Sequence, residues 1–148
     1  MVDPAKILVI LNLEASCSVK HLRATLGHTG YYRKFIKSYA QITVPMENLL
    51  KKYVTFCWDD DCNKTLDILK KKMVTTPILV LPNWKKKFHV HVHVHASCIA
   101  LGVVLTQEGG EGLDHPITFA SCRLSKAEKN YSTIEHKGLA MVYALQKY

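Results

Sequence analysis

Residues 88–107, FHVHVHVHASCIALGVVLTQ, decide the fold because they contain two strand-like runs separated by a short break. Successive side chains of an extended strand point to opposite faces, so alternate residues share a face. One face of the first run would carry four histidines, His89, His91, His93 and His95. Ala96 and Ser97 interrupt this alternation, and residues 98–106 form a second, more uniformly apolar run. The pattern predicts a tight antiparallel pair of strands.

The composition is that of an ordinary globular protein with one core or two small ones. The chain has 148 residues, of which 48% are hydrophobic and 22% charged. Twenty Lys and Arg residues against twelve Asp and Glu residues give a net charge of +8, which favours a polyanionic partner such as nucleic acid. The balance of charge therefore points to a binding partner and says nothing of the fold.

The cysteines and the N-terminal residues indicate in which cellular compartment the protein is expected. The five cysteines are scattered, without the paired spacings of a zinc ribbon or the density of a disulfide scaffold. The apolar run at residues 7–11 is too short to cross a bilayer and follows no basic leader. We expect an intracellular protein, cytoplasmic or nuclear, that is neither secreted nor held in a membrane.

Helical patterns dominate the chain before the two strands. The periodicity predicts a helix over residues 19–26 that ends at Gly27, a second over 31–39 and a third from Pro45, whereas residues 7–11 fit either helix or strand. The clearest pattern covers residues 60–74, with acidic residues in the first turn and lysines in the last, as the helix dipole favours.

The remainder of the chain predicts one more strand and one more helix. A third strand is expected at about residues 116–121, after a glycine-rich connection. Ser132 and Glu135 have the spacing of a capping box and open a helix that runs to the end of the chain. The predicted class is α+β, with a domain boundary in the charged turn after Pro82, between residues 1–82 and 83–148.

Six segments then carry a family resemblance, in order and over nearly the whole chain: LRATLGHTGYYRKFIKSYAQITVPMENLLKK, FCWDDDCNKTLDILKKKMVTTPILVLP, ASCIALGVVLTQ, HPITFAS, RLSKAEKNYSTIE and LAMVYAL. Together they resemble the polyprotein of gypsy-like LTR retrotransposons of plants. The resemblance implies a small helical bundle from the thumb or connection region of a reverse transcriptase, followed by a truncated RNase H-like unit of three antiparallel strands and a helix. The polymerase palm and its carboxylates would lie upstream, so we expect no polymerase activity.

The resemblance also places the catalytic positions of RNase H. Family members hold Mg²⁺ with a carboxylate cluster, which two-metal hydrolysis requires. The residues at the first two of these positions are His95 and Lys137, and the remaining two would lie beyond Tyr148. Glu135 is a poor substitute for a carboxylate at 137, because it lies about 200° around the helix and belongs to the capping box. We therefore expect a catalytically inactive chain with no metal cofactor.

Two surfaces remain as candidate binding sites. A basic and aromatic set resembles the thumb surface that grips an RNA–DNA or DNA duplex without reading its sequence, and its cationic members are Lys20, Arg23, Arg33, Lys34 and Lys37. The histidine row spaces its imidazoles as in many zinc sites, with Cys98 and His115 as the nearby additional ligands, and weak adventitious metal binding is expected there. Truncation would leave the histidine strand at an open edge, which predicts self-association. The alternative function is thus a repurposed interaction or metal-binding module.

Overall fold

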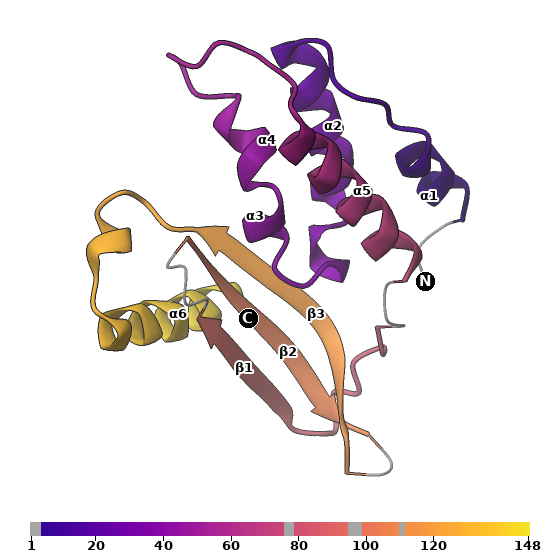
Figure 1. The fold of residues 1–148 in the computed structure, drawn as a ribbon. Helices are drawn as coiled ribbons and strands as arrows, with labels where there is room; N and C mark the ends of the chain where they lie inside the picture. Colours follow the sequence, from indigo (N-terminus) through magenta and orange to yellow (C-terminus); the bar gives the residue numbers. More distant parts are fainter. Residues whose placement is uncertain (1–3, 76–78, 95–98, 110–111) are drawn as a thin grey trace. The chain divides into compact units, whose positions relative to one another are not determined.

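The computed structural model describes residues 4–75, 79–94, 99–109 and 112–148. Two compact units divide the chain: the first comprises Met1–Ile36 and Ile42–Thr76, and the second comprises Lys37–Gln41 and Pro77–Tyr148. Helices build the first unit, and a three-stranded antiparallel sheet with one long helix builds most of the second (Figure 1). The predicted α+β class is confirmed. The boundary expected between residues 82 and 83 stays a prediction about domains.

The first unit contains five helical elements in the described residues: α1 (Pro4–Leu11), α2 (Val19–Tyr31), the 3₁₀ turn η1 (Arg33–Phe35), α4 (Val44–Asn48) and α5 (Asp60–Val74). A further short helix, α3 (Tyr39–Ile42), spans the junction between the units. The open alternative for residues 7–11 is settled as helix.

Helix α5 has the bounds that the sequence predicts. The Asp59 side chain caps it by accepting a hydrogen bond from the Cys62 N–H at 2.9 Å. Its buried stripe consists of Cys62, Thr65, Leu66, Leu69 and Met73. A cap, a favourable charge pattern and an apolar period agree here, which is why the local sequence sufficed.

Helix α2 does not end at Gly27, so that prediction is wrong. The helix runs on to Tyr31, because Thr25 and Thr29 continue the buried stripe that Leu22 begins. Glycine lowers helix propensity without forbidding a helix interior, and a Cβ added at Gly27 would meet nothing within 4 Å. Because Thr25 and Thr29 are polar, a helical period counted on apolar residues alone stops before Gly27.

The predicted helix over residues 31–39 is also wrong. Between α2, which ends at Tyr31, and α3, which begins at Tyr39, the chain forms only the 3₁₀ turn η1. Ser38 adopts a φ of 60°, in the left-handed region that no helix can include. Helix α4 forms where Pro45 predicted a start, with its proline in the first turn. The period at residues 31–39 thus reflects burial of Tyr32 and Ile36 from an irregular segment and of Tyr39 from the start of α3.

The second unit contains the sheet, with strands β1 (Phe88–Val94), β2 (Ala100–Glu108) and β3 (Asp114–Arg123) in the order β1-β2-β3. The 3₁₀ turn η2 (Glu128–Asn130) and helix α6 (Thr133–Lys147) follow. Both strand pairs are antiparallel, which confirms the predicted pairing of the two runs in residues 88–107. Strand β1 lies at one edge, and within the described residues no strand pairs with its outer side.

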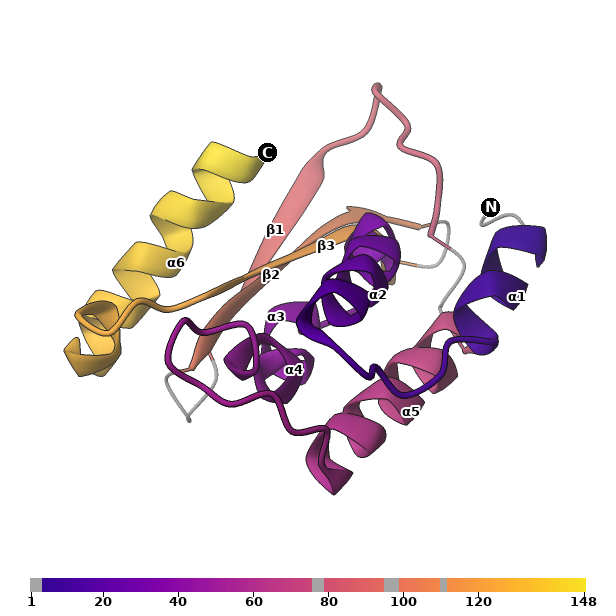
Figure 2. The ribbon, with the colours of Figure 1, turned by 90° about the horizontal axis from the view of Figure 1, so that it is seen from above.

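Helix α6 covers one face of the sheet (Figure 2). Its buried residues Ala140 and Ala144 pack over Leu101 and Val103 of β2, with Leu124 completing the core. The predicted capping box is present: the Ser132 and Glu135 side chains each accept a hydrogen bond from the other residue's backbone N–H. Odd-numbered residues of β2 therefore face the helix, and even-numbered residues face the opposite side of the sheet.

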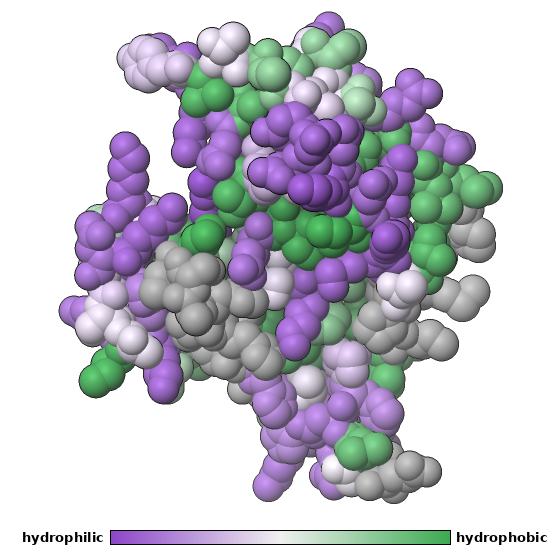
Figure 3. Space-filling view, in the orientation of Figure 1, coloured by the Kyte–Doolittle hydropathy of each residue, from purple (hydrophilic) through white to green (hydrophobic). Residues whose placement is uncertain are grey.

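The outer surface mixes polar and apolar side chains on the face that Figure 3 displays. Within the described residues, no helix has the length and apolar character needed to cross a membrane.

We expect Gly138→Ala to raise the free energy of unfolding by about 0.5–1 kcal/mol, since alanine costs less backbone entropy than glycine in a helix. Gly138 lies inside α6, and a Cβ added there would meet nothing within 4 Å. Urea unfolding followed by circular dichroism measures the change. Gly109→Ala is the opposite control, because a Cβ at Gly109 would lie 3.1 Å from the Leu113 backbone carbonyl oxygen and would displace the ring of His115. Stabilisation by both changes would contradict the argument.

Candidate functional site

One face of α2 is exposed along its whole length. Ser18 starts the helix by accepting the His21 N–H at 3.2 Å, which sets the face that each later residue occupies. The exposed residues follow the helical period: Lys20, Arg23, Ala24, Gly27, His28 and Tyr31. Cations thus lie near one end, an aromatic ring lies at the other, and the two smallest side chains lie between them. Such a face allows a polyanion to approach the helix backbone closely.

The structure divides the five predicted basic residues between the two units. Arg33 and Lys34 are exposed on η1, just after α2, and the Lys34 ammonium lies 5.1 Å from the centre of the Phe35 ring. Lys37 is also exposed but belongs to the second unit, where the neighbouring Ala40 N–H donates to Ser121 Oγ at 2.9 Å. Four of the five basic residues therefore lie in the first unit: Lys20, Arg23, Arg33 and Lys34.

The position that the sequence resemblance assigns to the second catalytic carboxylate carries a cation. Lys137 is exposed on the second turn of α6. Glu135 accepts the Ser132 N–H at 2.7 Å, so its carboxylate is committed to the capping box, as the sequence predicts. His95 lies outside the described residues. An ammonium group at 137 repels divalent cations, so the side chain found there does not fit Mg²⁺.

Two histidines of the predicted row share a carboxylate that the sequence analysis missed. His89 Nδ1 lies 3.1 Å from Asp114 Oδ1, and His91 Nε2 lies 2.8 Å from Asp114 Oδ2. The Thr106 hydroxyl also donates to Asp114 Oδ2, at 3.2 Å. Asp114 therefore binds three side chains on two different strands.

A β-bulge explains why alternation alone could not place Asp114. The register shifts between Leu105 and Thr106, leaving Ile117 as the extra residue of β3. The bulge reverses the facing of the residues that precede it, so Asp114 reaches the face that carries His89 and His91.

Of the two additional ligands predicted for the histidine row, His115 does not join the described part of it. His115 pairs with Gln107 and packs against Gly109, on the side of the sheet opposite His89. Cys98, His95 and the side chain of His93 lie outside what the structure describes. Across the described part of the chain, no three His, Cys, Asp or Glu side chains are arranged to hold a metal ion.

We expect acid to destabilise the fold through carboxylates that accept hydrogen bonds. Bonds to His91 and then His89 hold the pKa of Asp114 below its usual range, and backbone N–H donors do the same for Asp59, Glu128 and Glu135. Groups of this kind stabilise the protein above their unfolded pKa, near about 4, and that stability is lost as the pH falls through the lower folded pKa. Urea unfolding between pH 7 and 3 measures the loss.

The matched variant for this pH dependence is Asp114→Asn, which cannot ionise. Its free energy of unfolding should fall less steeply with acid than that of the unmodified protein. Parallel curves for the two proteins would contradict the assignment to Asp114.

A family model described as the RNase H-like domain found in reverse transcriptase matches residues 58–148. Two fruit-fly proteins are similar over nearly the whole chain. The Pol polyprotein from transposon 297 of Drosophila melanogaster is 40% identical over 99% of the chain, and that from transposon opus is 36% identical over 97%. The chain spans only 13% and 15% of the lengths of these relatives.

Solved structures agree on the fold. The foamy viral protease-reverse transcriptase in complex with dsDNA matches 99% of this chain with a TM-score of 0.84 at 19% identity, and the chain covers 30% of it. The same viral protein in complex with an RNA/DNA hybrid matches with a TM-score of 0.82. Since the matched model spans more than half of the residues, this chain belongs to the family of RNase H-like domains found in the reverse transcriptases of retrotransposon and retrovirus Pol polyproteins.

Proposed function

We propose that the chain is a retrotransposon-derived reverse transcriptase and RNase H-like segment that binds nucleic-acid duplexes nonspecifically and does not cleave them. The observation that carries the binding proposal is the exposed face of α2, with Lys20 and Arg23 beside Ala24 and Gly27. Lysine and arginine contact phosphates whatever the sequence, and small residues let the backbone of the duplex come near. The viral proteins of similar fold, which were solved with dsDNA and with an RNA/DNA hybrid, support this choice of ligand.

The absence of cleavage is proposed from the residues at the family's catalytic positions. Lys137 brings a positive charge where the family has a carboxylate, and His95 replaces the other carboxylate that the resemblance locates within this sequence. We propose in addition that the source is a gypsy-like LTR element of plants, as the motifs indicate. The intracellular, cytoplasmic or nuclear, location stays a prediction.

Binding to a duplex should weaken steeply with salt. If the four predicted basic residues in the first unit, Lys20, Arg23, Arg33 and Lys34, neutralise phosphates, the association constant falls with a logarithmic slope of about −3.6, or about 150-fold between about 50 and 200 mM salt. Fluorescence anisotropy of a labelled RNA–DNA hybrid measures this slope. Replacing Lys20 and Arg23 by alanine should bring the slope to about −1.8.

A control pair with the same change in net charge tests whether the salt dependence comes from the α2 face or from the net charge of the protein. Lys51 and Lys71 are exposed lysines of the same unit, and changing both to alanine should leave the slope near its original value. An equal loss of slope in the two pairs would show that net charge alone holds the duplex, and would remove α2 as the interface.

We propose self-association through the outer edge of β1 as a second role. Within the described residues the order β1-β2-β3 leaves one side of β1 without a partner strand, and such edges pair readily with another chain. Sedimentation over a range of concentrations tests this role: a rising mass supports it, and a constant monomer mass excludes it. The metal-binding form of this alternative has no comparable support among the described residues.

A further inference from the structure

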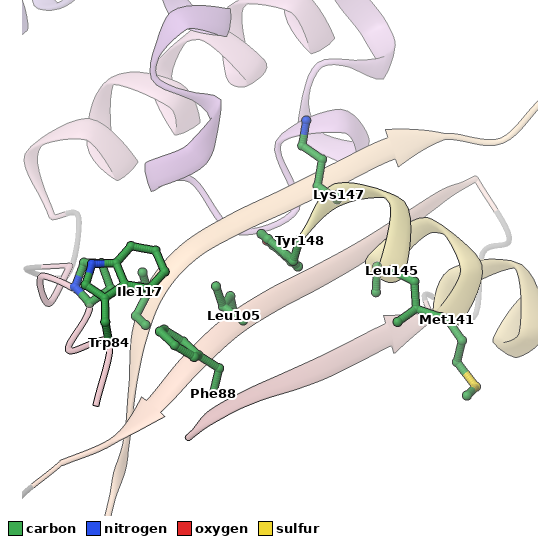
Figure 4. Close-up of a pocket in the computed structure, with 10 residues that line it drawn as sticks. Trp84, Phe88, Leu105, Ile117, Met141, Leu145, Lys147 and Tyr148 are labelled. Carbon is green, nitrogen blue, oxygen red and sulfur yellow. The ribbon is translucent and has the colours of Figure 1, made fainter. Parts of the chain in front are cut away.

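A largely apolar groove lies between the C-terminal end of α6 and the sheet, inside the second unit. Its volume is about 680 Å³, and its wall includes Trp84, Phe88, Leu105, Leu145 and Tyr148. In Figure 4 these side chains come from three directions: the turn before β1, the strands, and the last turns of α6. Pockets that hold small organic groups have volumes of about 300–1,000 Å³, so the groove has room for a nucleobase.

Trp84 is held in position although its ring is exposed. The residue is 83% exposed, and the centres of the Trp84 and Phe88 rings lie 5.8 Å apart, with the rings tilted to each other. The turn that carries it is fixed by Gln107, a buried residue of β2. The Gln107 amide accepts the Asn83 N–H at 2.8 Å and donates to the Asn83 and Lys86 carbonyls at 2.8 and 3.2 Å. The protein thus uses a buried polar side chain to present an indole ring to solvent.

The surroundings of the groove are basic. Three exposed lysines, Lys85, Lys86 and Lys87, follow Trp84 directly, and Lys147 lies on the groove wall with its ammonium directed away from the apolar side chains (Figure 4). None of the described residues that line the groove is acidic. An apolar peptide would use the groove but leave these charges without a role, whereas a polyanion with aromatic groups would use both.

We propose that this groove binds single-stranded nucleic acid, with one base stacked on Trp84 and the adjoining phosphates near Lys85, Lys86 and Lys87. Aromatic stacking and a basic track are the two components of sequence-independent single-strand binding. A duplex cannot supply the base, because its bases are already stacked and paired. The site is separate from α2 and goes beyond the duplex binding proposed for that helix.

The test uses Trp84 as its own probe. The protein has two tryptophans, so Trp58→Phe leaves Trp84 as the only indole. Adding a thymidine oligonucleotide of about 12 nucleotides should quench its fluorescence. On the otherwise unmodified chain, Trp84→Ala should weaken binding of a labelled oligonucleotide by about 5- to 150-fold, which is the worth of one stacked base. This second measurement does not depend on the folding of the Trp58→Phe variant.

Three comparisons decide the proposal. Tyr53→Ala removes an exposed ring that also lies beside a lysine, Lys52, but in the other unit, and it should leave single-strand affinity unchanged. Changing Lys20 and Arg23 to alanine should lower duplex binding and leave the quenching of Trp84 intact. The duplex site on α2 and the single-strand site at Trp84 can therefore fail independently of each other in this test. Equal quenching by a duplex, an equal loss in Tyr53→Ala, or protection of Trp84 in a dimer without nucleic acid would overturn the single-strand site.

Discussion

Leu101→Ala is expected to lower the free energy of unfolding by about 2–5 kcal/mol, which is the largest effect of any single change proposed for this chain. Leu101 is 1% exposed and packs against Leu124 and Ala140, where α6 meets the sheet. Truncation removes buried methyl groups and leaves a cavity, because the strand and the helix are both fixed by backbone hydrogen bonds. Urea unfolding at neutral pH measures the loss.

Leu145→Ala is the matched control for Leu101→Ala. The chemical change is identical, but Leu145 is 83% exposed on the same unit. Its replacement should change the free energy of unfolding by less than about 0.5 kcal/mol. Comparable losses at the two positions would mean that Leu101 is not in a packed core and that α6 is docked differently on the sheet.

Local sequence signals predicted those elements in which several signals agree. Helix α5 combines the Asp59 cap with a largely apolar stripe, and α6 combines a capping box with a long period, so both were predicted well. Helix α2 was cut short in the prediction because Gly27 was interpreted as a stop. Had Thr25 and Thr29 been counted as members of the buried stripe, the period would have continued through the glycine.

Contacts between distant residues were not predictable from spacing. Asp114 meets His89 and His91 only because the bulge at Ile117 changes which face the start of β3 presents. A bulge has no reliable sequence signal, and one extra residue reverses every assignment of faces beyond it. His89 and His91 were therefore placed correctly on one face of the strand, while their partner Asp114 was not predicted.

The same limit applies to Trp84. The sequence shows a charged turn at residues 83–87, which is a common feature of solvated surface. The structure shows that Gln107, about twenty residues later in the chain, holds this turn from inside the protein. What distinguishes a presented aromatic residue from an ordinary loop residue is thus a long-range hydrogen bond, which composition cannot reveal.

The second large effect concerns cleavage: we expect no hydrolysis of an RNA–DNA hybrid by this chain, in Mg²⁺ or in Mn²⁺. Two-metal hydrolysis needs carboxylates that hold both ions beside the scissile phosphate. At position 137 the chain has an exposed lysine, and the nearby Glu135 is bound to the Ser132 backbone. Enzymes accelerate their reactions by about 10⁶-fold or more, so loss of the metals should reduce the rate to that of the protein-free control.

The control for this experiment is the double change His95→Asp with Lys137→Glu, beside each single change. Because a two-metal site needs carboxylates from both positions, neither single variant should cleave the hybrid, and any gain should appear only when both acidic groups are present. Binding of the same hybrid, followed by anisotropy, shows whether each variant still engages it. A Mg²⁺-dependent nuclease activity that copurifies with the unmodified chain would contradict the proposal. The ions would then be held by carboxylates other than those at the positions that the family resemblance identifies.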